Sequence, residues 1–164
     1  MWLFRPARLD EATEACMVVR RSIEELCFAD HGGDQAILDR WLANKTPAQM
    51  RGWISADPAS IILGLGPDGI VGVGSILPGG KIALNYVAPW ARRQGVSKGL
   101  MRAMEQQALE AGHAVCTLTS TMTAYGFYLA YGYRDKGAPT CSFGGKPTFP
   151  MCRALTAGNC GDRR

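Results

Sequence analysis

Hydrophobic residues recur along this chain with two different spacings. In residues 9–27, apolar side chains return every three or four positions, which is the spacing of one face of an α-helix. Residues 34–55 repeat that spacing in a broken form, and Pro47 marks a restart because proline suits the first turn of a helix. Both stretches are therefore expected to be helical, with Asp10 as the N-cap of the first.

Two further helices are expected in the second half of the chain. Residues 94–111 combine an apolar stripe with a polar side that includes Glu105, and Gly112 supplies the stop. Residues 124–131 form a shorter helix that is closed by Gly132. On this pattern, Glu105 should face solvent.

Short β-rich runs separate the helical segments. Residues 60–66 and 69–77 flank a proline-aspartate-glycine turn, so they should form a hairpin. Residues 81–88 alternate with the period of a strand and should add the third strand of a meander. The other expected strands are residues 2–8, 114–120, 133–137 and 147–155.

The order of these elements limits the fold. A helix between residues 81–88 and 114–120 makes a right-handed parallel crossover natural. The whole order indicates an α+β (mixed α/β) fold, with a single mixed sheet of six or seven strands and helices on both faces. A chain of 164 residues is expected to form one domain, here residues 1–156, with 157–164 as a loose tail.

Composition disfavours several classes of protein. The chain is 47% apolar and 20% charged, close to ordinary globular values, so disorder is not indicated. The net charge of +4 comes without a long basic run, which disfavours a nucleic-acid-binding protein. Arg5 and Pro6 interrupt the apolar start, so no targeting segment is evident, and no stretch reads as a membrane span. A cytoplasmic protein is expected.

The six cysteines and two histidines show no metal-binding pattern. The cysteines include no C-x-x-C pair and mostly lie in apolar helix or strand patterns, which favours reduced, buried thiols over disulfides. His31 and His113 are too isolated to match the usual spacings of metal ligands. We expect no metal site.

Two stretches look like phosphate-binding motifs. Residues 64–69 match G-x-G-x-x-G by letter, but they lie between two expected strands, whereas the dinucleotide fingerprint needs a helix after it. Residues 92–98 have the right context, because a strand and a proline precede this basic turn and a helix follows it. The N–H groups of a helix start attract anions, and Arg92, Arg93 and Lys98 add positive charge. Taken alone, the turn is equally consistent with a solvated basic surface.

An aromatic stretch decides between these two interpretations. The sequence TAYGFYLAYGY, residues 123–133, places Phe127 and Tyr128 in the short helix and Tyr133 just after it. Phe127 and Tyr133 fit a hydrophobic core. Tyr128 is the aromatic residue expected to turn its hydroxyl toward the opening of the sheet.

Together, the two stretches resemble the GNAT superfamily of acyl-CoA-dependent N-acetyltransferases. The acetyl-CoA loop of that superfamily, Q/R-x-x-G-x-G/A, corresponds to RRQGVS at residues 92–97, where Ser97 replaces the last small residue. The later motif, A-x-x-F-Y-x-x-x-G-F/Y, matches residues 124–133 at every defined position. The order of elements also agrees over nearly the whole chain.

The resemblance implies a site at the end of the third meander strand. The backbone of Val87 and Ala88 would hold the pantetheine arm of acetyl-CoA where two neighbouring strands splay apart. Thr119 and Ser120 would line the other side of that opening, and Tyr128 would protonate the departing thiolate. The turn that would wrap the pyrophosphate comprises Arg92, Arg93, Gln94, Gly95, Val96, Ser97 and Lys98.

The physical chemistry suits direct transfer of the acetyl group to an amine. A tyrosine hydroxyl, with an ordinary pKa near 10, stays protonated at pH 7 and can protonate a thiolate whose conjugate acid has a pKa of about 8.5. The backbone N–H of Val87 would meet the developing oxyanion. The expected acceptor is a primary amine of a small molecule or a peptide.

A general base is not evident in the sequence. Deprotonating an alkylammonium with a pKa near 10.4 costs about 4.6 kcal/mol at pH 7, whereas an α-amino group costs only about 1 kcal/mol. Many members of the superfamily carry a glutamate on the strand before the loop, but here that strand offers only Asn85. Glu25, Asp30 and His31 are substitute candidates, and His31 is more simply a loop residue without a catalytic role.

Three aromatic residues and one alternative function complete these expectations. Trp41, Trp53 and Phe28 are candidate walls of an acceptor pocket, although aromatic residues at helical spacing are more often core. The missing glutamate leaves open a module that binds acyl-CoA as a sensor or regulator without turnover. Exposed strand edges make a homodimer plausible.

Overall fold

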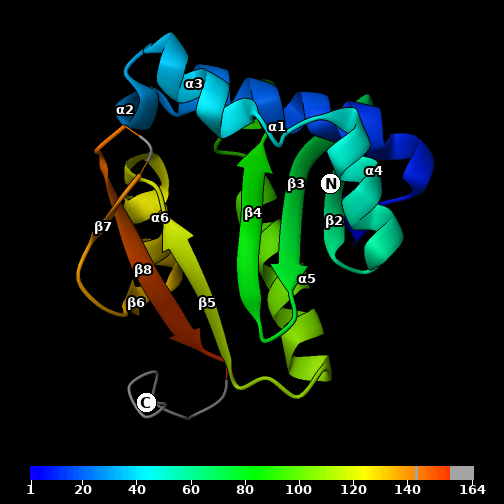
Figure 1. The fold of residues 1–164 in the computed structure, drawn as a ribbon. Helices are drawn as coiled ribbons and strands as arrows, with labels where there is room; N and C mark the ends of the chain where they lie inside the picture. Colours follow the sequence, from blue (N-terminus) through cyan, green and yellow to red (C-terminus); the bar gives the residue numbers. More distant parts are fainter. Residues whose placement is uncertain (143, 156–164) are drawn as a thin grey trace.

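One mixed sheet forms the centre of the molecule in the computed structural model of the chain (Figure 1). The structure describes residues 1–142 and 144–155. The strands are β1 (Leu3–Pro6), β2 (Ile61–Gly66), β3 (Gly69–Leu77), β4 (Lys81–Val87), β5 (Val115–Ser120), β6 (Arg134–Asp135), β7 (Thr140–Cys141) and β8 (Pro147–Ala154). The α-helices are α1 (Ala12–Leu26), α2 (Phe28–His31), α3 (Gln35–Leu42), α4 (Pro47–Ala56), α5 (Val96–Glu110) and α6 (Met122–Tyr131).

The sheet consists of two halves that meet at one point. Strands β1 to β4 form an antiparallel meander, and β5, β8 and β6 form a second antiparallel group with β7 paired to β8. Between the halves, β4 and β5 run parallel and share a single register pair, Lys81 with Thr117. The expected parallel crossover is confirmed, and the two strands separate beyond that pair (Figure 1).

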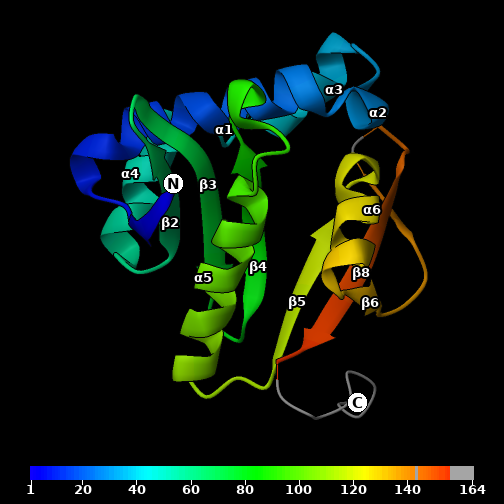
Figure 2. The same ribbon diagram turned by 180° about the vertical axis from the view of Figure 1, so that it is seen from behind.

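Helices cover both faces of the sheet, as predicted. Helices α5 and α6 lie on the face turned to the viewer in Figure 2, and α1 and α4 lie on the opposite face. Two glycines of β3 let α5 approach closely. A Cβ atom added at Gly72 would lie 2.6 Å from Cγ1 of Val96, and one at Gly74 would lie 2.9 Å from Sδ of Met104. The mixed α/β architecture is thus confirmed, with short β6 and β7 bringing the sheet to eight strands.

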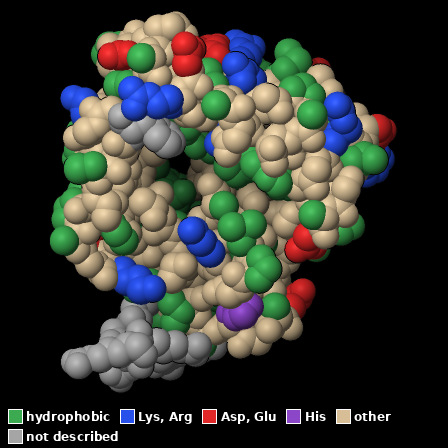
Figure 3. Space-filling model, in the orientation of Figure 1, with side chains coloured by type: hydrophobic (Ala, Val, Ile, Leu, Met, Phe, Trp, Pro, Cys, Tyr) green, Lys and Arg blue, Asp and Glu red, His purple; other side chains and the backbone are tan. Residues whose placement is uncertain are grey.

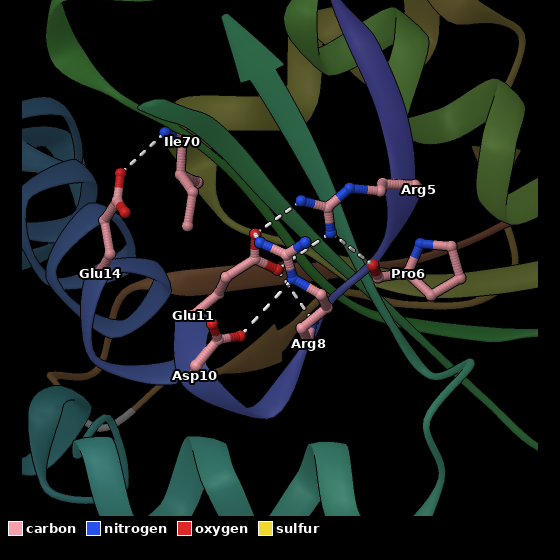
Figure 4. A network of polar contacts seen from close by, with 7 residues as sticks. All are labelled: Arg5, Pro6, Arg8, Asp10, Glu11, Glu14 and Ile70. Carbon is pink, nitrogen blue, oxygen red and sulfur yellow. Dashed lines mark hydrogen bonds and ion pairs between the residues drawn. The ribbon is translucent and has the colours of Figure 1, made fainter. Parts of the chain in front are cut away.

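The start of the first helix differs from the prediction. Asp10 does not cap it; a 3₁₀ turn, Leu9–Glu11, precedes α1, and the Glu11 carboxylate accepts a hydrogen bond from the backbone N–H of Arg8. Glu11 also forms a two-bond ion pair with Arg5 of β1, while Asp10 pairs with the Arg8 side chain (Figure 4). A glutamate at the third position of the turn can reach back to the free N–H, and this contact replaces the expected cap.

Glu105 is also placed differently from the prediction. The residue is only 6% exposed and lies among the buried residues of α5. Its carboxylate accepts hydrogen bonds from the hydroxyls of Tyr131 and Tyr133 and pairs with Arg153 at 2.7 Å. A charged side chain is tolerated inside the protein when such donors compensate its lost hydration. The helical pattern alone does not show these partners.

The other predicted elements appear within a few residues of their expected ends. Helices α3 and α4 have Asp34 and Thr46 as N-caps, and Pro47 starts α4 as expected. Four of the five described cysteines are buried, whereas Cys141 is exposed, and none of the five is in a disulfide. In the described part of the chain, no helix is long and apolar enough to cross a membrane. The expected tail, residues 157–164, lies outside the described residues.

Candidate functional site

A cleft of about 580 Å³ opens where β4 and β5 separate. Its walls come from the C-terminal end of α1, the end of β4, the start of α5 and the start of α6. Figure 3 shows the surface hollowed over this region, below α3 and between β4 and the β5–β8 strands. The two halves of the sheet share one register pair between β4 and β5, and this cavity lies at their junction.

The start of α5 forms one wall of the cleft and is built to face an anion. The helix begins after Gly95, which has a φ of 84° and makes no side-chain cap. Arg93 has a φ of 63° and is the one non-glycine residue with positive φ in the described chain. These two left-handed residues turn the chain sharply just before the helix, whose first N–H groups have no intrahelical partners, as at every helix start.

Most of the basic turn that the sequence singled out lines this cleft. Its lining residues are Arg92, Arg93, Gly95, Val96, Ser97 and Lys98. Gln94 is the exception, because its side chain donates to the carbonyl oxygen of Trp90 and its own carbonyl accepts from the indole N–H of Trp2. The structure thus brings three cations and a helix start to one cavity, while Gln94 helps to hold the turn.

At the end of β4, the backbone groups of Ala88 are already bonded, whereas the N–H of Val87 faces the opening. The N–H of Ala88 donates to Val71 of β3 and its carbonyl accepts from Ala91, so both polar backbone atoms of Ala88 already have partners. N–H directions alternate along a strand, so that of Val87 points away from β3 and toward the opening. Val87 lines the cleft and Ala88 is fully buried.

A hydrogen-bonded chain crosses the opening from α5 to α6. The Ser97 hydroxyl donates to Oδ1 of Asn85 at 2.9 Å, and Nδ2 of Asn85 donates to the hydroxyl oxygen of Tyr128 at 3.1 Å. Tyr128 is 6% exposed, and burial raises the pKa of its hydroxyl to about 12. The hydrogen bond from Asn85 lowers this pKa but does not offset the effect of burial. The phenol is therefore protonated at neutral pH, with its O–H free to donate.

Tyr128 opens into a narrow slit of about 60 Å³ between β4 and β5, beside the main cleft. Thr119 and Ser120 line this slit from the β5 side, opposite Leu84 and Asn85. Ser120 is buried and donates its hydroxyl to the carbonyl of Thr121. The slit and the cleft share Asn85, so the phenol lies at the border between the two spaces.

The three candidate bases all have structural partners. The Asp30 carboxylate accepts from the backbone N–H groups of Met122 and Thr123 and from the Thr123 hydroxyl, so it caps α6. The buried His31 ring contacts carbonyl oxygens at the end of α1 and accepts from a backbone N–H of the next loop. Glu25 is exposed and pairs with Arg21. Among the described residues that line the cleft, there is no aspartate, glutamate or histidine.

The aromatic candidates separate in the structure. Trp41 is buried and donates its indole N–H to the hydroxyl of Tyr86, which lines the cleft. Phe28 is 65% exposed and packs edge-to-face on His31. Trp53 lines a different cavity beside β4. Phe127, expected in the core, is half-buried and also lines the cleft.

Sequence reasoning missed the wall that α1 and the start of α6 contribute. The additional lining residues are Ser22, Leu26, Cys27, Thr121 and Thr123. One signal was available, because a threonine directly before a helical run is a common N-cap, and Thr121 caps α6 in this way. Burial raises the pKa of the Cys27 thiol to about 12, which disfavours its thiolate form.

This arrangement can bind an extended anionic molecule and deliver a proton to it. The turn at α5 supplies positive charge and N–H donors for an anionic group. The cleft extends from there to Val87 and Asn85, and Asn85 donates to the hydroxyl of Tyr128 in the adjoining slit, which can protonate a leaving group. Among the described residues, no group of three possible metal ligands was found.

Comparisons with known proteins agree with this arrangement. A family model described as an acetyltransferase (GNAT) domain matches residues 28–155. Among curated proteins, no sequence match was found. Several solved structures share the fold.

Three of these structures show the range of the likeness. A GCN5-related N-acetyltransferase from Rhodopseudomonas palustris has a TM-score of 0.81 at 22% identity, covering 93% of this chain and 95% of that one. The PaiA N-acetyltransferase of Thermoplasma acidophilum, solved with coenzyme A, has a TM-score of 0.72 at 14% identity, covering 94% and 99%. The ribosomal-protein-S18-alanine N-acetyltransferase of Escherichia coli has a TM-score of 0.64 at 12% identity, covering 100% of both.

Proposed function

Because the chain belongs to the GNAT acetyltransferase family, we propose that it transfers an acetyl group from acetyl-CoA to a primary amine of a small molecule or a peptide. The observation that carries this proposal is the cleft lined by the basic turn at α5, together with the Tyr128 hydroxyl in the adjoining slit, to which Asn85 of the cleft donates. Family membership supplies the reaction class, and the cleft supplies the groups that such a reaction needs. The amine attacks directly, without a covalent enzyme intermediate.

The residues of the cleft fit coenzyme A. Arg93 and Lys98, with the first N–H groups of α5, would hold the pyrophosphate, while Val87 would contact the pantetheine arm. Arg92 is exposed and also lines the cleft, where it adds positive charge. Bound acetyl-CoA supplies a thioester whose acetyl group can pass to an amine.

Tyr128 is the proposed general acid. Its hydroxyl oxygen already accepts from Asn85, which leaves the O–H free to point into the opening. Burial raises its pKa to about 12, so the hydroxyl holds its proton at neutral pH and is a weak acid toward the thiolate. The same Asn85 N–H then stabilises the phenolate that proton donation leaves behind, and Ser97 fixes the orientation of the Asn85 amide.

The Val87 N–H is the proposed oxyanion donor. The N–H of the next residue, Ala88, is bonded to β3, and N–H directions alternate along a strand. The N–H of Val87 therefore points into the gap where β4 and β5 are no longer paired. A fixed backbone donor of this kind stabilises charge that appears only during the reaction. Its position on a paired strand holds it in place without a further support.

The amine is proposed to react as the free base, without a protein base in the cleft. The described lining offers no carboxylate or imidazole, and Asp30 and His31 are committed to capping contacts. An amine with a low pKa therefore reacts most easily at neutral pH, because more of it is already deprotonated. The rate with an alkylamine should rise about tenfold per pH unit below the pKa of that amine.

Replacing Tyr128 by phenylalanine tests the general acid. Tyr128→Phe keeps the ring but removes the proton, so kcat should fall by about 10²-fold or more, while the affinity for coenzyme A, measured by calorimetry, stays the same. Tyr125→Phe is the matched control, since Tyr125 lies on the same helix but bonds to Asp135 on the surface. An unchanged kcat for Tyr128→Phe would remove the acid role.

Replacing the two cations tests the cofactor cradle. Arg93→Ala and Lys98→Ala should each weaken coenzyme A binding by about tenfold, and the loss should shrink as salt is added, because it is electrostatic. Equal binding by variant and parent at low salt would contradict the placement of the pyrophosphate.

The cleft also supports one alternative function. Because its described lining contains no general base, the protein could bind acyl-CoA as a sensor or regulator without turnover. Coenzyme A release, followed over a panel of amines, separates the two. Tight binding of acetyl-CoA with no release on any amine would favour the sensor.

A further inference from the structure

Lys45 is a buried cation outside the cleft described above. The residue is 9% exposed, and its ammonium donates one hydrogen bond, at 2.6 Å, to the side-chain oxygen of Asn44. In the described part of the chain, no carboxylate lies within ion-pair distance of it. Burial lowers the pKa of Lys45. An ammonium has three donors, so this group has unused bonding capacity.

The backbone at Lys45 is held firmly. Its carbonyl oxygen accepts from the Cys16 thiol at 3.1 Å and from Nη1 of Arg20 at 2.7 Å, and both donors belong to α1. The next residue, Thr46, caps α4. The side chain therefore leaves the backbone from a fixed point, as is usual for a group that must meet a ligand in a set position.

Lys45 lines a cavity of about 360 Å³ between α4 and the strands β3 and β4. Trp53 and Leu84 provide apolar walls, and Ser75 adds a hydroxyl. Asp57 also contributes to the lining, but it is exposed and accepts from the backbone N–H of Ala59. Ligand pockets commonly combine apolar walls with a few polar or charged groups, and a cation among such walls suits a small anion that carries an apolar body.

This cavity adjoins the catalytic opening. Ala83 and Leu84 of β4 line both the cavity and the slit that holds Tyr128. Leu84 is three residues from Val87 along one strand, a separation of about 10 Å at the usual rise per residue. An acceptor that reacts at the opening and also contacts the Lys45 cavity would therefore have to span a distance of this order.

We propose that the Lys45 cavity binds an anionic group of the acceptor, so that the acceptor is a primary amine that also carries a carboxylate or a phosphate. This inference rests on the proposed function for its amine end. The charge of the described cleft supports it, because the lining residues include cations but no acidic side chain that would attract a polycationic amine. Lys45 then recognises the substrate at a distance from the reacting atoms.

A kinetic comparison tests the preference. The amines are ω-amino carboxylates from glycine to 6-aminohexanoate and 4-(aminomethyl)benzoate, each paired with its amide, together with 2-aminoethyl phosphate and 3-aminopropyl phosphate. The parent should favour the acids over their amides by about 10- to 100-fold in kcat/KM, as expected for a charge-assisted contact. Carboxylate and phosphate amines of equal length show which anion the cavity takes.

The variants show whether Lys45 causes that preference. Lys45→Met keeps the length but removes the charge, so the preference for acids should disappear while kcat/KM for the amides changes by less than about threefold. Lys45→Arg should retain part of the preference. Lys136→Met, which changes an exposed lysine that lines neither the cleft nor the Lys45 cavity, is the matched control and should behave like the parent.

A binding measurement keeps the test independent of turnover. Benzoate and phenyl phosphate, titrated by NMR, should bind the parent and Lys136→Met with similar affinity. Their affinity for Lys45→Met should be at least tenfold lower. Thermal unfolding and coenzyme A binding verify that each variant is folded. Binding that depends on Lys45 without acetylation of any amine would contradict the proposed function and leave the anion site standing. Acids and amides acetylated equally well by parent and Lys45→Met would overturn the anion site alone.

Discussion

Single residues in this protein have roles that depend on the partner of each polar atom. Asn85 is the clearest case, since it stands where the family resemblance leads one to expect a glutamate. Its two amide atoms have different partners, Ser97 on one side and Tyr128 on the other. An amide can donate and accept at once, whereas a carboxylate could not donate to the phenol oxygen. The residue is therefore suited to orient the acid and not to act as a base.

Changes at Asn85 should affect catalysis through Tyr128. Asn85→Ala removes the donor to the phenol oxygen, so we expect kcat to fall about tenfold, because the phenolate loses one hydrogen bond. Asn85→Asp should lower kcat further, because a carboxylate beside Tyr128 opposes phenolate formation. Kinetics at saturating acetyl-CoA measure both. A higher kcat for Asn85→Asp would instead indicate that the strand position acts as a base.

The pH dependence of stability should include the contribution of Glu11. The hydrogen bonds from Arg5 lower the pKa of Glu11 to about 2. Because the folded pKa lies below the unfolded value, near 4.3, the stabilisation is complete above about pH 4.5 and is lost as the pH falls from there toward 2. After allowance for solvent screening, this amounts to about 1–2 kcal/mol.

Glu11→Gln tests this contribution. The variant should unfold with a free energy about 1–2 kcal/mol lower than the parent at pH 7, and the difference should shrink at pH 3. Denaturant unfolding at both pH values measures it. Asp10→Asn is the control, because Asp10 is exposed and contacts only the exposed Arg8 side chain, so little change is expected. A difference that stays constant from pH 7 to pH 3 would contradict the assignment.

At the scale of elements, the packing of α5 on the sheet positions the basic turn. The first turn of this helix lies over the glycines of β3, where Gly72 leaves room for Val96 and Leu100. The same turn begins with Gly95 and contributes Ser97 to the chain of hydrogen bonds that ends at Tyr128. The distance between helix and sheet therefore sets the position of both the anion site and the acid.

Gly72→Ala should disturb both stability and cofactor binding. The added Cβ would lie 2.6 Å from Val96 and 3.0 Å from Leu100, so α5 must shift. We expect a loss of about 1–3 kcal/mol in the free energy of unfolding and weaker binding of coenzyme A. Thermal unfolding and calorimetry measure these effects. Gly52→Ala in α4, where a Cβ meets open space, is the control and should be neutral or slightly stabilising. Parent-like coenzyme A binding by Gly72→Ala would contradict the coupling.

The elements themselves could be predicted from the sequence more completely than their contacts. Local patterns were enough to find the hairpin, the α4 restart at Pro47 and the basic turn, because periodicity and turn residues act over short distances. The contact of Glu11 with the N–H of Arg8 is local, three residues apart, whereas the cap formed by Asp30 on α6 depends on segments brought together by folding. Glu105 was expected in solvent for the same reason, since its partners follow it by 26 to 48 residues.

For the candidate site, the sequence indicated the turn and the acid but not the rest of the cleft. Motif spacing placed Arg92, Arg93, Lys98 and Tyr128, which the structure brings to one opening or its border. The α1 wall and the buried Lys45 have no local signature, because burial and the absence of a countercharge are properties of the folded chain. Ala88 was expected to offer its backbone to the cofactor. Its N–H and carbonyl already have backbone partners, however, and the sheet register that defines them is not visible in the sequence.

At the scale of the whole molecule, the opening exists because the two halves of the sheet are joined mainly by side chains. Beyond the single β4–β5 register pair, Asp30 of α2 binds the start of α6, and Asn85 of β4 binds Tyr128. Farther along α5, Glu105 binds two tyrosines and Arg153 of the second half. These contacts keep the halves apart at a fixed distance while leaving the cleft open.

Weakening the Glu105 contacts should therefore loosen one half of the molecule more than the other. Glu105→Gln keeps the size of the side chain but removes the charge that faces Arg153 and the hydroxyls of Tyr131 and Tyr133. We expect the free energy of unfolding to fall by about 1–3 kcal/mol, because the remaining polar groups lose their strongest acceptor. Amide hydrogen exchange should accelerate in β5, α6 and β8 and remain slow in β2 and β3.

Glu110→Gln on the same helix is the matched control. Glu110 is exposed and accepts only from the side chain of Gln106, so its change should alter the free energy of unfolding by less than about 0.5 kcal/mol. Uniform acceleration of exchange in both halves of Glu105→Gln would mean that the sheet unfolds as one unit. In that case the strands alone would determine the width of the cleft. The Glu105 contacts would then have no separate role in holding the halves apart.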